Sequence, residues 1–263
     1  MSRIKLLSSY EGTHYFGWQK TKMGPSIEEE MEKALSQILQ EKVDLEAASR
    51  TDRGVHAEGQ VVCFSSEKKL DPFRIQKGLN ALLPKDISIL EASEVADDFH
   101  PTLDNVAKEY HYEVCLGDIQ LPFHRNFSWH FFYPLELGTM KEASKFFLGK
   151  HDFSAFCNMR LFLQSDKIRT IYSLEIIPLP QNRLRISIIG DRFLYKMVRN
   201  IVGTLLYVGC GKLTLEQIPL ILENKDRKEA GMTAPAHGLF LKKVFYELPG
   251  FIHLDLVHCG VLS

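Results

Sequence analysis

The sequence has no apolar run long enough to cross a bilayer, because none reaches the roughly 18 residues that a spanning helix needs. Its N-terminal segment, Met1–Ser9, also lacks the long apolar core and the small-residue cleavage site of a signal peptide. These absences argue against a membrane partner and predict a cytoplasmic protein. The hydrophobic fraction of 45% and the charged fraction of 25% are those of an ordinary globular protein.

The sequence also lacks the patterns that hold disulfides, metals and cofactors. Its cysteines are odd in number, widely scattered and without a CxxC pair, which argues against a disulfide framework and a structural zinc site. There is no glycine-rich phosphate loop and no dinucleotide-binding fingerprint. We therefore expect neither a metal nor a cofactor.

The chain carries little net charge, with a formal value of −1 at pH 7. A generic nucleic-acid binder is more basic, with a pI above ~9. Any RNA-binding surface must therefore be a local basic patch that acidic residues elsewhere offset. The candidate contributors are Arg50, Arg53, Lys108, Arg160, Lys167, Arg169, Arg192, Lys196 and Arg199.

Hydrophobic periodicity predicts strands interleaved with helices in the first part of the chain. Short β-branched or alternating segments indicate strands at Ile4–Tyr10, Val61–Ser65 and Ile87–Leu90. Apolar residues at helical spacing indicate a helix at Ile27–Gln40, which follows Pro25-Ser26. A second helix is predicted at residues 71–83, where Asp71-Pro72 opens it and Pro84 stops it.

The second part of the chain repeats this order. The expected strands are Lys108–Leu116, Thr170–Pro178, Leu184–Ile189 and Leu239–Tyr246, and the expected helices are Leu137–Leu148, Tyr195–Val208 and Leu215–Leu222. We therefore expect an α+β fold with two similarly built halves, each a mostly antiparallel sheet with helices on one face. The halves are residues 1–103 and 104–263, because Pro101 and Asp104-Asn105 interrupt the pattern near His100–Asn105.

The segment most informative about chemistry is Ala48–Ala57, which reads Ala-Ser-Arg-Thr-Asp-Arg-Gly-Val-His-Ala. Asp52 lies between Arg50 and Arg53, and Gly54 lets the backbone turn sharply and present the carboxylate. The guanidinium charges favour an ionised carboxylate, which suits a nucleophile. The alternative is an aspartate in a surface turn that forms a salt bridge with one of the two arginines.

This motif, Arg50-Thr-Asp-x-Gly-Val-His56, is accompanied by further distinctive blocks. They are Tyr10–Gln19, Asp98–Pro101, Lys108–Tyr112, Phe193–Gly203 and Ala234–Leu239. In their order and over nearly the whole chain, the blocks resemble those of the tRNA pseudouridine synthases of the A type. The Arg-Thr-Asp tripeptide alone would be a weak signal, whereas several blocks in order are a strong one.

The resemblance implies that Asp52 is the catalytic nucleophile, attacking either ribose C1′ or the uracil ring. Tyr110 aligns with the active-site tyrosine, which stacks on the flipped uracil and is a candidate base late in the reaction. From the residues alone, Tyr110 could instead be a cross-strand partner of Tyr112. Arg199 aligns with an arginine that pairs with the catalytic carboxylate. The alternative for Arg199 is a place on the polar face of its helix.

The resemblance also implies RNA contacts near the nucleophile. Arg50 aligns with a residue linked to the RNA, and we assign it to phosphate binding or to holding the flipped nucleotide. Arg53 stands where the family commonly has a small residue, so it either adds a phosphate contact or reaches solvent. We expect a structural role for His56. The segment Arg160–Lys167, which has no close match, is a candidate RNA-facing loop.

If the resemblance holds, the chain isomerises uridines 38, 39 and 40 in the anticodon stem-loop of tRNA. The site would be a central RNA-binding cleft between the halves, and the enzyme a homodimer whose tRNA contacts both subunits. One alternative is a synthase of the same family acting on another RNA site. A second is a non-catalytic RNA-binding protein, which the presence of Asp52, Tyr110 and Arg199 disfavours. A third is a hydrolase using Asp52 with Glu58, whose spacing does not recommend it.

Overall fold

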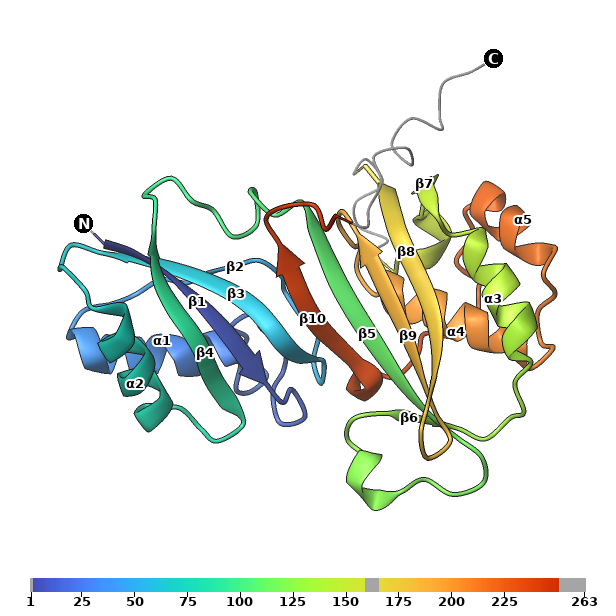
Figure 1. Cartoon of the computed structure of the whole chain (residues 1–263), viewed down its shortest axis with the longest axis horizontal. Coiled ribbons are helices and arrows are strands. Elements are labelled where there is room, and N and C mark those ends of the chain that lie inside the picture. Colours follow the sequence, from blue (N-terminus) through green and yellow to red (C-terminus); the bar gives the residue numbers. More distant parts are fainter. Residues whose placement is uncertain (1, 159–165, 251–263) are drawn as a thin grey trace, which may run out of the picture. The chain divides into compact units, whose positions relative to one another are not determined.

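The computed structural model describes residues 2–158 and 166–250, over which the chain forms ten β-strands, five α-helices and three short 3-10 helices (Figure 1). The chain divides into two compact units. Unit 1 is formed by the described residues up to Val106 with Phe240–Glu247, and unit 2 by the described residues of Ala107–Leu239. The sequence predicted a boundary between residues 103 and 104, and the first boundary between the units lies between Val106 and Ala107. The closing strand, expected in the second half, belongs to unit 1 because it pairs with a strand there.

Unit 1 contains an antiparallel sheet with one added parallel strand. β1 (Ser2–Tyr10) lies between β3 (His56–Ser66) and β4 (Ile87–Val95) and is antiparallel to both. β10 (Leu239–Phe245) runs parallel to the start of β3, with Phe240 opposite His56. The two-residue strand β2 (Glu46–Ala47) pairs with the middle of β3. The sheet therefore brings the first and the last of the described strands, β1 and β10, into one unit.

Two helices pack in unit 1, and each begins at a capping residue. The Ser26 hydroxyl accepts a hydrogen bond from the backbone of Glu29 and starts α1 (Ile27–Leu39). Asp71 caps α2 (Pro72–Leu82), which packs against β4 and α1. Side chains at helical spacing in α1 are buried, as are alternate residues of β1, so the core lies between helices and sheet.

Unit 2 also contains antiparallel strand pairs. β5 (Ala107–Leu116) pairs with β9 (Arg183–Gly190), β9 with β8 (Ile168–Leu179), and β8 with β7 (Gly149–Asp152). The short strand β6 (Trp129–Phe131) adds parallel to β5. Short 3-10 helices lie at Pro122–His124, Ser154–Phe156 and Ala236–Gly238.

The core of unit 2 is built around α4 (Met197–Gly209), which is buried along nearly its whole length. α3 (Leu137–Lys145) packs against α4 and β8, and α5 (Gln217–Asn224) packs against the 3-10 helix after β7. None of the described helices is long and apolar enough to span a membrane.

The structure confirms the expected α+β class and every strand and helix that periodicity predicted. It adds β2, β6, β7 and the 3-10 helices, which the sequence analysis did not predict. The four cysteines in the described part of the chain are free thiols, and Cys259 lies outside it.

Candidate active site

The loop that carries Asp52 joins β2 to β3 in unit 1, and its first residues are held by hydrogen bonds to β3. The backbone N–H of Ala48 donates to the carbonyl of Val61 at 2.9 Å. The side-chain amide of the fully buried Gln60 holds Ser49 from both sides, accepting from its N–H at 3.2 Å and donating to its carbonyl at 2.6 Å. The loop thus leaves the sheet in a defined direction.

Thr51, the residue before Asp52, is buried and bonded at both its hydroxyl and its carbonyl. Its Oγ1 lies 2.7 Å from the Tyr10 hydroxyl, and its carbonyl accepts from the backbone N–H of Trp18 at 3.0 Å. Gly17, next to Trp18, has φ +103°, and a Cβ at this position would lie 2.7 Å from the Thr51 carbonyl oxygen. A glycine is therefore required for the turn after β1 to lie against this loop.

Asp52 itself is half-buried at the head of a tight turn. The N–H of Val55 donates to the Asp52 carbonyl at 3.1 Å, and Gly54 has φ +77°. The flanking Arg50 and Arg53 are exposed, and neither forms an ion pair with a carboxylate among the described residues. The Arg53 guanidinium instead lies 4.1 Å from the centre of the Phe16 ring.

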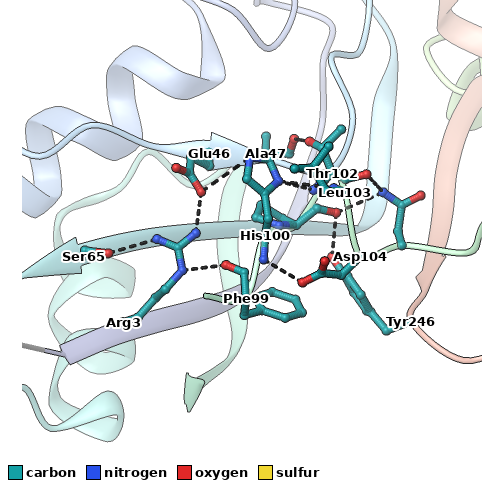
Figure 2. Close-up of polar contacts among 12 residues, drawn as sticks. Arg3, Glu46, Ala47, Ser65, Phe99, His100, Thr102, Leu103, Asp104 and Tyr246 are labelled. Atoms are coloured by element: carbon teal, nitrogen blue, oxygen red, sulfur yellow. Dashed lines mark hydrogen bonds and ion pairs between the residues drawn. The ribbon is translucent and has the colours of Figure 1, made fainter. Parts of the chain in front are cut away.

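A polar network secures the strand that precedes the loop (Figure 2). The Arg3 guanidinium forms an ion pair with Glu46 of β2 and donates to the Phe99 carbonyl at 2.6 Å. The Thr102 hydroxyl donates to the carbonyl of Ala47 at 2.7 Å. The segment after β4 is thus fastened to the strand from which the Asp52 loop begins.

His100 organises that segment. The ring Nδ1 of His100 accepts hydrogen bonds from the backbone N–H groups of Thr102 and Leu103, at 3.1 and 3.2 Å, and the backbone N–H of His100 donates to the Asp104 carboxylate (Figure 2). His56, at the start of β3, is likewise a structural part of unit 1. Its buried ring accepts from the N–H of Gly12 at 3.0 Å and stacks on Phe240 at 4.7 Å.

In unit 2, Tyr110 is a buried residue of β5. Its ring meets the Phe193 ring edge to face, with centroids 5.1 Å apart. The residue opposite Tyr110 in the ladder is Ile188, and Tyr112 lies two residues further along the same strand. The interpretation of Tyr110 as a cross-strand partner of Tyr112 is therefore wrong.

Arg199 lies in the first turn of α4, is half-buried, and is bound to the residues that follow α5. Its Nε donates to the carbonyl of Ala234 at 2.7 Å, and its backbone carbonyl accepts from the Ala234 N–H at 3.1 Å. The Tyr112 hydroxyl donates to the next carbonyl, that of Pro235, at 2.8 Å. Burial raises the pKa of Tyr112, while the nearby charge of Arg199 acts in the opposite direction. Two consecutive residues thus connect the strand of Tyr110 with the helix of Arg199.

Arg227 holds this connecting segment against α4. Its guanidinium donates to the Asn200 side chain at 2.9 Å and to the Gly231 carbonyl at 2.8 Å. The Thr233 hydroxyl donates to the same Asn200 oxygen at 2.7 Å. Burial lowers the pKa of Arg227. Because Asn200 is adjacent to Arg199, the clamp fixes the part of the helix that carries the predicted site residue.

The structure therefore places the predicted site residues in two groups. Unit 1 holds Arg50, Asp52 and Arg53 on one loop, and unit 2 holds Tyr110 and Arg199 on neighbouring elements. Sequence reasoning did not find Gln60 and Arg227, which support these groups. No cluster of three histidine, cysteine or acidic residues within the described ranges could hold a metal ion. Arg160 of the expected RNA-facing loop lies outside the described residues.

The family model described as tRNA pseudouridine synthase matches residues 6–104 and 143–247, which is more than half of the chain. The chain belongs to this family. It is therefore an RNA-uridine isomerase, as the resemblance implied. Both matched segments contain predicted site residues, with Asp52 in the first and Arg199 in the second.

Curated relatives support this assignment over almost the full length of the enzyme. "tRNA pseudouridine synthase A 2" of Protochlamydia amoebophila is 52% identical over 248 residues, covering 94% of this chain and 95% of the relative. "tRNA pseudouridine synthase A" of a Thermoanaerobacter species is 41% identical, covering 94% of this chain and all of the relative. Among solved structures, an archaeal box H/ACA sRNP Nop10–Cbf5 complex is 14% identical with a TM-score of 0.35, covering 83% of this chain and 60% of that one.

Proposed function

We propose that the enzyme converts uridine to pseudouridine at positions 38, 39 and 40 of the tRNA anticodon stem-loop, with Asp52 as nucleophile. The observation that carries this proposal is the fixation of Thr51 at both its hydroxyl and its carbonyl, immediately before the half-buried Asp52. A side chain on a loop held in this way can be presented to a substrate without being ordered first. The family match and the names of the relatives support tRNA as the substrate.

The reaction exchanges one bond for another within a single nucleotide. The Asp52 carboxylate adds to ribose C1′ or to the uracil ring, and the bond between C1′ and N1 breaks. The detached uracil turns so that C5 bonds to C1′, and the bond between Asp52 and the nucleotide breaks, which frees the carboxylate. C5 then loses its proton, and N1 carries a proton in the product. Atoms and electrons balance without redox chemistry or an added group, so the residues of the chain are sufficient.

We propose that Tyr110 stacks on the flipped uracil and that Arg199 pairs with the negative charge of the catalytic carboxylate. The edge contact of Phe193 fixes the Tyr110 ring, which suits it to replace the stacking that a base loses outside its helix. The bond from Arg199 Nε to the Ala234 carbonyl holds the guanidinium in a defined orientation. We assign Arg50 and Arg53 to RNA binding because both are exposed beside Asp52.

The proposal is tested by release of tritium from tRNA labelled at uracil C5, with wild type and Asp52→Asn measured side by side. We expect release by the wild type alone, with the tRNA affinity of the variant within a few-fold. Appreciable release by Asp52→Asn would contradict the assignment of the nucleophile. Mapping pseudouridine in the product then tests the three positions, and modification elsewhere would favour a different RNA target.

Tyr110→Phe separates stacking from proton transfer. The ring remains, so we expect RNA affinity to persist while the rate of C5 proton loss falls. An unchanged rate of tritium release in a single turnover would rule out Tyr110 as a base and leave the stacking role.

We also propose that the enzyme is a cytoplasmic homodimer in which one tRNA contacts both subunits. The near-neutral net charge supports this, because two local basic patches can flank one RNA without making the whole chain basic. Sedimentation of the free enzyme and of its tRNA complex should give a dimer. A monomer in both states would contradict the proposal.

A further inference from the structure

Lys108 and Tyr110 project from the same face of β5, because side chains two residues apart in a strand point the same way. In the ladder Lys108 lies opposite Gly190, the last residue of β9. The chain after Gly190 continues through Asp191 and Arg192 to Phe193, whose ring packs against Tyr110. One short segment therefore carries both an arginine and the aromatic support of Tyr110.

Arg192 follows two residues after Gly190, the ladder partner of Lys108, so two positive charges lie near each other. Lys108 is half-buried, and burial lowers its pKa to about 8, with the neighbouring charge of Arg192 acting in the same direction. Within residues 2–158 and 166–250, neither side chain has an ion-pair partner. The adjacent carboxylate of Asp191 accepts from the backbone N–H groups of Thr170 and Arg192, at 2.9 and 2.6 Å.

An unpaired cation that is partly removed from water is unfavourable, and a like charge beside it adds to the cost. Such a pair is relieved when an anion binds between them. An RNA phosphate is the anion that accompanies every nucleotide, and both lysine and arginine bind phosphate well. Lys108 and Arg192 are distinct from Asp52, Tyr110 and Arg199, so the proposed reaction does not account for them.

We propose that Lys108 and Arg192 together bind one phosphate of the substrate RNA beside the uridine that stacks on Tyr110. This inference rests on the proposed function, because it takes Tyr110 as the stacking residue. It gives the second unit a backbone contact of its own, in addition to Arg50 and Arg53 on the first. A phosphate held here would set the register of the RNA before the base reaches the tyrosine.

The test measures the affinity of an anticodon stem-loop RNA over a series of salt concentrations for Lys108→Met, Arg192→Gln and the double variant. Each phosphate contact contributes about 0.7–0.9 to the slope of log affinity against log salt. We expect either single change to lower the slope by about that amount. We expect the double change to lower it no further, because both residues serve one phosphate. Lys108→Arg should keep the wild-type slope.

The matched control is Lys145→Met, which removes an exposed lysine that pairs with Glu142 within α3. Its slope should equal that of the wild type. Unchanged slopes in the Lys108 and Arg192 variants would overturn the proposal, and additive losses would replace it with two separate phosphates.

A second measurement locates the phosphate. Stem-loops with one neutral methylphosphonate each are compared, and one position next to the target uridine should weaken wild-type binding but not binding by Lys108→Met. Equal sensitivity of the two proteins at every position would contradict the proposal. Wild-type tritium release is an independent readout. If the wild type releases tritium while the salt slopes of the Lys108 and Arg192 variants equal the wild-type slope, the proposed phosphate site is wrong and the proposed function remains. If it fails while the slopes change, the phosphate site remains and the reaction is wrong.

Discussion

The side-chain amide of Gln60 makes two hydrogen bonds to the backbone of Ser49, one to its N–H at 3.2 Å and one to its carbonyl at 2.6 Å. The Gln60 side chain therefore satisfies the backbone N–H and carbonyl of Ser49, as a neighbouring strand would do in a sheet. This hydrogen bonding replaces sheet pairing where the chain leaves β2 and enters the Asp52 loop, so the loop geometry depends on a buried side chain.

Gln60→Met should lower both stability and kcat. The change keeps the size of the side chain but leaves both backbone groups of Ser49 without their partner, which costs about 1–3 kcal/mol. The loop loses its fixed direction, so we expect kcat to fall about tenfold, equivalent to ~1.4 kcal/mol, with little change in RNA affinity. The control is Gln76→Met, which removes the hydrogen bond from Gln76 of α2 to the carbonyl of Leu90 in β4 and should keep the wild-type kcat. A wild-type kcat in Gln60→Met would show that the two hydrogen bonds between Gln60 and Ser49 do not contribute to catalysis.

Gly17→Ala should lower stability and kcat by more than the positive φ of Gly17 alone predicts. The matched control is Gly211→Ala, because Gly211 also has a positive φ, +74°, but a Cβ there would meet nothing within 4 Å. The control should lose about 1 kcal/mol from left-handed strain and keep its kcat. At Gly17 the new methyl group meets the Thr51 carbonyl, so we expect an additional loss of stability and a lower kcat. Equal effects of the two changes, measured by urea unfolding and tritium release, would contradict this account.

Arg227→Met should reduce kcat by disturbing the position of Arg199, because Arg227 does not itself contact the substrate in the proposed reaction. The change leaves Asn200 and the Gly231 carbonyl short of a charged donor, at a cost of about 1.5–3 kcal/mol per bond. The segment that holds the Arg199 side chain then loosens. At a temperature well below the melting point we expect a lower kcat with an unchanged KM, partly restored in Arg227→Lys. The control, Arg125→Met, removes an exposed arginine bonded to the Pro122 carbonyl and should alter neither constant.

Lys108 should make stability depend on pH in the alkaline range. Its pKa falls from the ordinary 10.5 to about 8 in the folded chain, so between these values the unfolded chain binds more protons. Stability from this group therefore rises with pH from about 8 to 10.5, and the cost of burying the charge is present in full below pH 8. The stability advantage of Lys108→Met over wild type should be largest at pH 7 and should shrink as the pH approaches 10, as measured by urea unfolding. A pH-independent difference would contradict the lowered pKa of Lys108.

Much of the fold could be predicted because local signals and tertiary packing agree. Ser26 and Asp71 begin their helices, as expected from their sequence context. The exceptions occur where the partner is distant. β3 begins at His56, five residues before the expected start, because its first residues pair with β1 and β10. α4 begins at Met197, two residues later than expected, because Lys196 takes a left-handed conformation. Strands as short as β2 and β6 show no periodicity that a sequence pattern could reveal.

For the candidate site, the motif residues were predictable because they form recognisable blocks, whereas their supports were not. Gln60 is a single polar residue before the buried run Val61–Phe64, and a sequence does not show whether such a side chain turns inward. Arg227 lies in a polar stretch that reads as a surface loop. Its partners, Asn200 and Gly231, are recognised only when the chain after α5 is seen against α4.

The pairing of β10 with β3 has a consequence for synthesis on the ribosome. Phe240 stacks on His56, and Gly59 lies against the backbone of Lys242, so the last strand completes the packing around the end of the Asp52 loop. Chains grow at about 5–20 residues per second, and domains ordinarily fold in the order in which they emerge. Here unit 1 emerges first but lacks a strand until the residues of unit 2 that precede β10 have been made. Asp52, the proposed nucleophile, therefore reaches its final surroundings only after β10 has been synthesised.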